Sequence, residues 1–133
     1  MLAAEVWDDA GQLKGGRPLG GGINFGESWR TAIIREFNEE LGIDVTVKGI
    51  PLLMENIFVH EGVTGHEVAF ISEVEFPDAE FKNQESVDFQ EGNAVSGVAR
   101  WFDLADLDLD DGPKLYPTGL KDLLLEAAKG GPV

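Results

Sequence analysis

Short stretches of alternating apolar and polar residues occur along most of the chain, and this period of two is typical of half-buried strands. The stretch 66–76 shows it most clearly, since its apolar residues alternate with Glu67, Glu73 and Glu75, which would face solvent. A turn is expected just before it, at residues 63–65. The pattern therefore predicts strands at residues 2–7, 45–48, 52–60, 66–76 and 95–102.

Two segments instead repeat their apolar residues at the spacing of an amphipathic helix. The first follows Ser28, a good N-cap residue, and ends before Gly42, a typical residue after a helix C-terminus. The second follows Thr118, which we expect to be its N-cap, and should end at Gly130. The apolar faces comprise Ile33, Ile34, Phe37 and Leu41 in the first helix, and Leu120, Leu123, Leu124 and Ala127 in the second.

The remaining segments are expected to be loops. Residues 14–22 contain five glycines and one proline, residues 77–92 are polar and acidic, and residues 103–112 form an acidic turn with at most one helical turn. No repeat and no linker interrupts the succession of strands and helices. The fold class is therefore α+β or mixed α/β, in a single domain over residues 1–133.

The charge of the chain limits the partners it can have. The chain has 133 residues, of which 10 are basic and 25 acidic, and its net charge is −15. This charge would repel DNA and RNA, so we expect no nucleic-acid partner. It would also repel a phosphate-containing small molecule, unless divalent cations lie between the two. The absence of cysteine excludes disulfides, thiolate catalysis and zinc–sulfur sites.

The hydropathy pattern gives no sign of a membrane segment. No apolar run approaches the roughly 18–20 residues that cross a bilayer. Residues 1–9 have neither the basic flank nor the long apolar core of a secretory signal. We therefore expect a soluble cytoplasmic protein without a membrane partner.

Three glutamates of the first predicted helix, Glu36, Glu39 and Glu40, are spaced i, i+3, i+4 and share one helical face. Like charges at this spacing repel one another. A hard cation such as Mg²⁺, which prefers oxygen ligands, would relieve the repulsion. Taken alone, however, such a set is more often a solvated acidic face.

The flanking residues change this interpretation. Gly21 is followed after five residues by Glu27, and after seven more by the run 35–43, Arg-Glu-Phe-Asn-Glu-Glu-Leu-Gly-Ile. This is the complete pattern G-x5-E-x7-R-E-U-x-E-E-x-G-U, with Phe37 and Ile43 at the apolar positions U. The chain therefore resembles the Nudix hydrolases. The resemblance covers nearly the whole chain, because residues 17–22, 55–58, 65–67 and 115–117 also look like one bacterial branch of that family.

The resemblance implies a fold and an activity. The fold would be a mixed β-sheet sandwiched between α-helices, with a catalytic loop–helix–loop at residues 21–43. The activity would be the Mg²⁺- or Mn²⁺-dependent hydrolysis of a nucleoside diphosphate linked to another group X.

The resemblance also implies roles for the residues of the box. Glu39 and Glu40 match the main metal ligands, and Glu36 matches a further ligand or the residue that orients or deprotonates the attacking water. The Gly20 carbonyl matches a metal contact of some members. Glu27 and Arg35 match a pair that braces the loop against the helix.

Further residues outside the box could bind metal or substrate, but each could equally have a purely structural role. Glu91 is the first choice for an additional metal-binding carboxylate and Glu85 the second, although both could belong to a solvated acidic loop. The expected substrate-binding residues are Arg17, Gly21, Gly22 and His66, although a single histidine is more often structural.

The substrate is less defined than the reaction. Phe58 and Val59 stand where ADP-ribose hydrolases often have proline, and His60 and Glu61 stand where many diadenosine-polyphosphate hydrolases have tyrosine. Nucleoside triphosphates are therefore favoured, with ADP-ribose as an alternative. A catalytically weak nucleotide-binding or sensor module is a second reading. Isopentenyl-diphosphate isomerase chemistry requires a cysteine, which this chain lacks.

The N-terminal strand raises a question of assembly. Relatives usually have a further strand and hairpin before the segment that matches residues 2–7. Either the true start of the protein lies upstream of Met1, or the strand is an unpaired apolar edge that a second copy covers. We therefore expect a homodimer.

Overall fold

The computed structural model describes residues 1–91 and 95–129, and its contacts divide the chain into two compact units. The first comprises residues 1–19 together with the described part of 84–133, and the second comprises Gly20–Asn83. The α+β class and the mixed sheet predicted from the sequence are confirmed.

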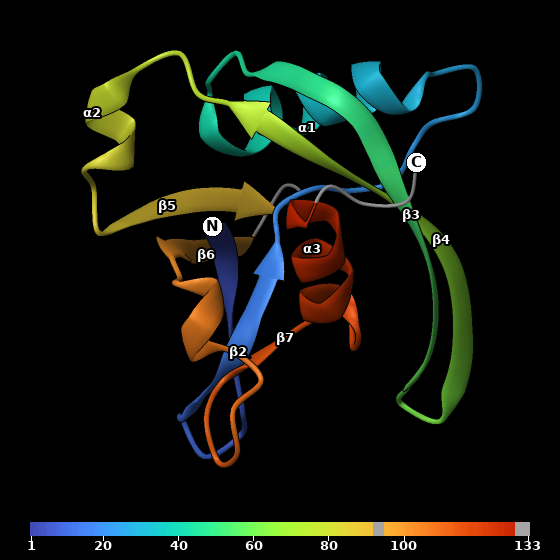
Figure 1. Cartoon of the computed structure of the whole chain (residues 1–133), viewed down its shortest axis with the longest axis vertical. Helices are drawn as coiled ribbons and strands as arrows, with labels where there is room; N and C mark the ends of the chain where they lie inside the picture. Colours follow the sequence, from blue (N-terminus) through green and yellow to red (C-terminus); the bar gives the residue numbers. More distant parts are fainter. Residues whose placement is uncertain (92–94, 130–133) are drawn as a thin grey trace. The chain divides into compact units, whose positions relative to one another are not determined.

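The first unit is built on a five-stranded sheet with the strand order β5-β6-β1-β2-β7 (Figure 1). The β2–β7 pair is parallel, whereas the other three pairs are antiparallel. The strands are β1 (Leu2–Trp7), β2 (Leu13–Pro18), β5 (Ser86–Glu91), β6 (Val95–Trp101) and β7 (Lys114–Leu115).

Strand β1 is not the unpaired edge that the sequence led us to expect. It lies inside the sheet, where Ala3 is opposite Pro18 of β2 on one side and Arg100 of β6 on the other. Ala3 and Ala4 are almost completely buried. The expected reason for dimerisation is therefore wrong.

The glycine-rich segment 14–22 was expected to be a loop, but its first part belongs to β2. Gly15 and Gly16 are buried in that strand. A side chain at Gly15 would collide with the backbone of Lys114, and one at Gly16 would lie 2.9 Å from the Phe102 ring. The glycines thus permit close approach of β7 and of an aromatic ring, a use of glycine within strands that composition alone does not reveal.

The acidic segment 77–92 also contains structure where a loop was expected. It forms α2 (Ala79–Lys82), which belongs to the second unit, and β5 in the first. In β5, Phe89 is buried and packs its ring over Gly97 of β6, where a Cβ atom would be only 2.6 Å from the ring. The short alternation of Val87 and Phe89 with polar residues was not recognised within a segment that is polar and acidic overall.

The C-terminal part of the first unit follows the expected pattern except at one cap. A 3₁₀ turn, η1 (Leu104–Asp106), is the single helical turn expected in the acidic segment. Helix α3 (Leu120–Ala128) is capped by Gly119 at φ +97°, with no side-chain cap, so the prediction of Thr118 is wrong. The predicted helix end at Gly130 lies outside the described residues.

In the second unit, helix α1 (Trp29–Leu41) has the predicted ends. The Ser28 side chain accepts a hydrogen bond from the Thr31 N–H, and Gly42, at φ +68°, donates its N–H to the Asn38 carbonyl. Both caps are local features, and both satisfy backbone groups that a helix end leaves free. None of the helices within the described residues has the length and apolarity to cross a membrane.

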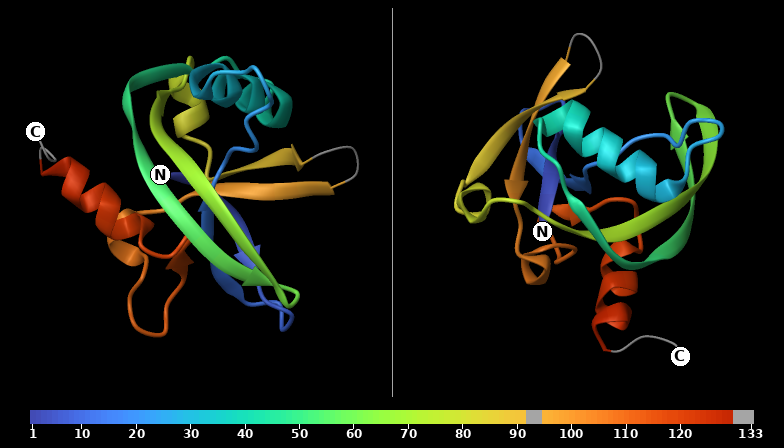
Figure 2. Two further views of the ribbon diagram at one scale, coloured as in Figure 1. Left: turned by 90° about the vertical axis from the view of Figure 1, so that its right-hand side faces the viewer. Right: turned by 90° about the horizontal axis from the view of Figure 1, so that it is seen from above.

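Strands β3 (Thr46–His60) and β4 (Val63–Glu75) form a long antiparallel hairpin (Figure 2). The two strands predicted at 45–48 and 52–60 are one strand with an irregularity between Lys48 and Leu52. The chain reverses at Glu61–Gly62, not at the predicted residues 63–65. Both turn residues have positive φ, of 51° and 80°, as a two-residue hairpin turn requires.

Candidate active site

The Nudix-like box forms a glycine-containing loop followed by helix α1, all within the second unit. Arg35, Glu36, Glu39 and Glu40 lie on α1, which places the carboxylates on neighbouring turns. The three carboxylates differ in environment. The side chain of Glu36 is 15% exposed and that of Glu39 is 59% exposed, whereas Glu40 is half-buried with one oxygen shielded from solvent.

Arg35 joins the loop to the helix. Its Nε and Nη2 donate to the two oxygens of Glu27, over 2.7 Å and 2.9 Å. The Nη2 also donates to the Gly22 carbonyl over 2.9 Å. This is the bidentate geometry that makes an arginine–carboxylate pair directional as well as strong. The brace that the family resemblance implied for Glu27 and Arg35 is therefore present in the structure.

Glu27, the acidic partner of Arg35, is held in place by a tight turn. The Glu27 N–H donates to the Asn24 carbonyl over 2.9 Å, and the Asn24 N–H donates to the Glu27 carboxylate over 3.1 Å. Gly26, at φ +83°, has a conformation that favours glycine. Asn24, which stands where many relatives have glutamate, thus holds Glu27 through a four-residue turn, a role that the sequence did not lead us to expect.

The charge state of the brace follows from its hydrogen bonds. The Arg35 guanidinium, helped by the Asn24 N–H, lowers the pKa of Glu27 from 4.5 to about 2. In turn, the hydrogen bond with Glu27 raises the pKa of Arg35. Because the pKa of Glu27 is lower in the folded state, its ionisation stabilises the fold above about pH 4.5, and this stabilisation is lost as the pH falls through about 2.

The substitution Glu27→Gln should therefore lower the thermal unfolding midpoint at pH 7, in the presence of a chelator, because Arg35 loses its bidentate partner. The difference from the unsubstituted protein should shrink as the pH falls from 4.5 towards 2, where Glu27 itself becomes protonated. Circular dichroism melting curves across this range measure the effect. A difference that stays constant from pH 7 to pH 2 would contradict it.

Gly21 packs its backbone directly against a box carboxylate. A Cβ atom at this position would collide with the Glu36 carboxyl group, whose Oε2 would be 2.7 Å away. Glu36 also accepts a hydrogen bond from Arg35 Nη1 over 3.0 Å. The Glu36 carboxylate is therefore held between the glycine loop and the arginine, and Gly21 is needed for the space it leaves.

The structure brings together only some of the predicted site residues. Gly21, Gly22, Glu27, Arg35, Glu36 and Glu39 form the connected set just described. Gly20 begins the same unit, at φ +155°. Arg17 is an exposed residue of β2 in the first unit. Glu91 ends β5, and its side chain lies outside the described residues.

His66 lies on the hairpin, where its Nε2 is 2.8 Å from the Glu55 carboxylate. Glu55 lies diagonally across from His66, whose register partner is Ile57. The neighbouring pair is directly opposite in the register, with Asn56 Nδ2 donating to Glu67 over 3.0 Å. Sequence reasoning missed both pairs because it placed the turn at 63–65. Once the turn is placed at Glu61–Gly62, the cross-strand register brings these residues together.

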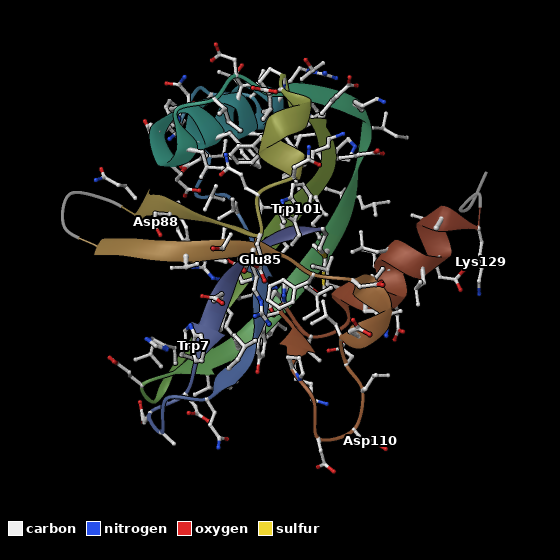
Figure 3. The ribbon with its side chains drawn as sticks, turned by 90° about the vertical axis from the view of Figure 1, so that its left-hand side faces the viewer. Trp7, Glu85, Asp88, Trp101, Asp110 and Lys129 are labelled. Carbon is white, nitrogen blue, oxygen red and sulfur yellow. The ribbon has the colours of Figure 1, made fainter. Side chains whose placement is uncertain are left out.

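The donor set suits a hard divalent cation, although it does not form a closed cage. No group of three or more His, Asp or Glu side chains within the described residues converges in a way that could hold an ion. Glu85, Asp88 and Asp110 of the first unit also lie apart from one another (Figure 3). Mg²⁺, however, usually keeps several waters and needs only one or two carboxylates besides substrate phosphates. The carboxylate oxygens on α1 therefore fit this ion in their chemistry.

Comparison with known proteins agrees with the local structure. A search among curated proteins finds no match to this chain. The family model described as the NUDIX domain matches residues 5–123, which include the glycine loop, all of α1 and the β3–β4 hairpin. With the complete box folded as a braced loop and helix, and the match extending over most of its length, the chain belongs to the Nudix hydrolase family.

Proposed function

We propose that this protein hydrolyses a phosphoanhydride bond in a nucleoside diphosphate linked to another group X, as a divalent-metal-dependent pyrophosphohydrolase. The observation that carries the proposal is the braced box. One arginine joins the glycine loop to helix α1, while the backbone of Gly21 lies against the Glu36 carboxylate. A protein that only bound nucleotides would have no need for three carboxylates that repel one another on one helix.

The proposed metal ligands are Glu39 and Glu40, with Glu36 and the Gly20 carbonyl as further candidates and Glu91 as the predicted additional carboxylate. A bound Mg²⁺ or Mn²⁺ ion would neutralise the charge of the diphosphate and acidify water. Such an ion would also overcome the repulsion between an anionic substrate and a chain of net charge −15.

In the proposed hydrolysis, the residues of this chain position the reacting groups and accept a proton. Hydrolysis forms a bond from a water oxygen to phosphorus, breaks the bond to the bridging oxygen and releases a proton, which a carboxylate can accept. Glu36 is the candidate acceptor, because Arg35 and Gly21 hold its carboxylate in place. The predicted substrate-binding residues stay Arg17, Gly21, Gly22 and His66.

The preferred substrates are nucleoside triphosphates, and ADP-ribose is the alternative. Chromatography of the nucleotide products formed with Mg²⁺ or Mn²⁺ from a panel of nucleoside triphosphates, ADP-ribose and nucleotide sugars tests both, because each of these reactions yields a nucleoside monophosphate. We expect turnover of at least one class and its complete loss with excess chelator. Tight nucleotide binding without turnover of any panel member would instead support the sensor-module alternative, and full turnover in chelator would contradict the proposed chemistry.

Three further expectations from the sequence stay predictions. They are a single domain over residues 1–133, a cytoplasmic location and a homodimer. Because β1 is paired on both sides, the original reason to expect a dimer no longer holds. Light scattering of the purified protein measures the oligomeric state directly.

A further inference from the structure

Arg35 contacts more carboxylates than a brace requires. Besides the two bonds to Glu27, its Nη1 donates to Glu36 over 3.0 Å and to Glu39 over 3.3 Å. One guanidinium thus contacts three carboxylates, two of which are proposed metal ligands. The side chains of Arg35 and Glu36 are only 25% and 15% exposed, so the contact between them is partly protected from solvent and from screening by salt.

We propose that Arg35 is a positioning residue that acts as the internal counter-ion of Glu36 and Glu39 in the metal-free protein and competes with the divalent cation for them. This inference rests on the proposed function, since it assumes that these carboxylates hold the metal. The same charge that keeps the empty carboxylates together would therefore weaken their affinity for the ion.

The Arg35 guanidinium is bound more firmly to Glu27 than to Glu39, as the role of a displaceable counter-ion requires. The bonds to Glu27 are the shorter ones, and the Glu27 side chain is 12% exposed. The contact with Glu39 is longer, and that side chain is 59% exposed. Exposed pairs of this kind contribute little stability. Glu39 can thus leave Arg35 for a cation while the bond to Glu27 keeps the loop in place.

The competing explanation is that Arg35 serves only as a brace, and its contacts with Glu36 and Glu39 are incidental. Two substitutions separate the explanations. Glu27→Gln removes the bidentate brace and keeps the cation beside Glu36 and Glu39. Arg35→Gln removes the brace and the cation together. Because the two substitutions change the net charge in opposite directions, the variants are compared at about 0.3 M salt, which screens the general field of the protein. Under that condition, a brace alone predicts closely similar changes in Mg²⁺ affinity for both variants, whereas a counter-ion predicts changes that differ.

The experiment is a calorimetric titration of Mg²⁺ into the full chain, with the unfolding midpoint of the metal-free protein as a second readout. We expect Arg35→Gln to bind Mg²⁺ about tenfold more tightly than Glu27→Gln, because the competing cation is gone. Without metal, Arg35→Gln should have the lower unfolding midpoint, because its carboxylates then lack a counter-ion.

The matched control is Arg30→Gln, which removes the same charge from the same helix. Arg30 contacts the Val47 carbonyl and lies over the Trp29 ring. Its loss should change the Mg²⁺ affinity much less than the loss of Arg35. The Arg35 effect should also persist at about 0.3 M salt, where the general field of the protein is screened.

If Arg35→Gln does not fold, Arg35→Lys takes its place. Lysine keeps the charge but cannot form the planar fork that reaches several carboxylates, so this variant should also bind Mg²⁺ more tightly than Glu27→Gln. Equal affinities of the Arg35 and Glu27 variants would overturn the inference while the proposed function stands, provided the unsubstituted protein binds Mg²⁺ and turns over substrate. Absence of Mg²⁺ and Mn²⁺ binding to the unsubstituted protein would overturn both.

Discussion

The substitution Glu40→Gln is expected to lower the kcat of nucleotide hydrolysis by roughly 10²- to 10³-fold, because it removes one charge from the set of proposed metal ligands, and a bound metal contributes several kcal/mol to such reactions. Gln has nearly the same size as Glu, and Glu40 is half-buried. The fold should therefore be retained, and the unfolding midpoint in chelator should stay the same or rise, because one repelling charge is gone.

The matched control is Glu126→Gln on α3, which changes the net charge by the same amount. Glu126 is exposed and contacts Lys129 over 3.8 Å, a weak surface pair. It should keep the activity of the unsubstituted protein. Steady-state kinetics at saturating Mg²⁺ measure both variants. A Glu40→Gln protein that retains more than about half of the original kcat would exclude Glu40 from the proposed metal site.

The parts of the fold that were predicted well are those that depend on local sequence. Helix α1 was predicted with both of its caps, because Ser28 and Gly42 act on backbone groups within four residues of themselves. The single turn of η1 follows the same logic, since the Asp103 side chain accepts from the Ala105 N–H two residues later. Such signals require no knowledge of the rest of the chain.

The errors occurred where distant segments decide the structure. Gly15 and Gly16 are typical of a loop until β7 and Phe102 are known to lie against them. Likewise, the sequence of β1 does not show that β6, about a hundred residues later, pairs with it. In both cases, the deciding contact is with a segment whose position the local pattern does not indicate.

In the candidate site, too, the features set by local sequence were predicted and those set by side-chain contacts were not. The spacing of Glu36, Glu39 and Glu40 placed them on one helical face, and the family pattern named Glu27 and Arg35 as a brace. The additional contacts of Arg35 with Glu36 and Glu39 could not be predicted. An arginine side chain has several rotamers, and the turn formed by Asn24 and Glu27 selects among them by fixing one end of the guanidinium.

A second large effect is expected from Gly21→Ala. The added Cβ atom would collide with the Glu36 carboxyl group, which is the movable end of a side chain and not backbone. The protein should therefore fold with a small decrease of its unfolding midpoint, while the displaced carboxylate loses its position beside the loop. A displacement of about 1 Å at a reacting group can cost on the order of 10²-fold in rate, so we expect kcat to fall about 10- to 100-fold.

The comparison variant is Gly22→Ala, one residue further along the same loop. A Cβ atom at Gly22 would meet nothing within 4 Å, so the chemical change is the same but the collision with Glu36 is absent. Its loss of kcat should be clearly smaller than that of Gly21→Ala, at equal Mg²⁺ and with the folded fraction checked by circular dichroism. Equal losses in the two variants would mean that the loop backbone, and not the position of Glu36, limits catalysis.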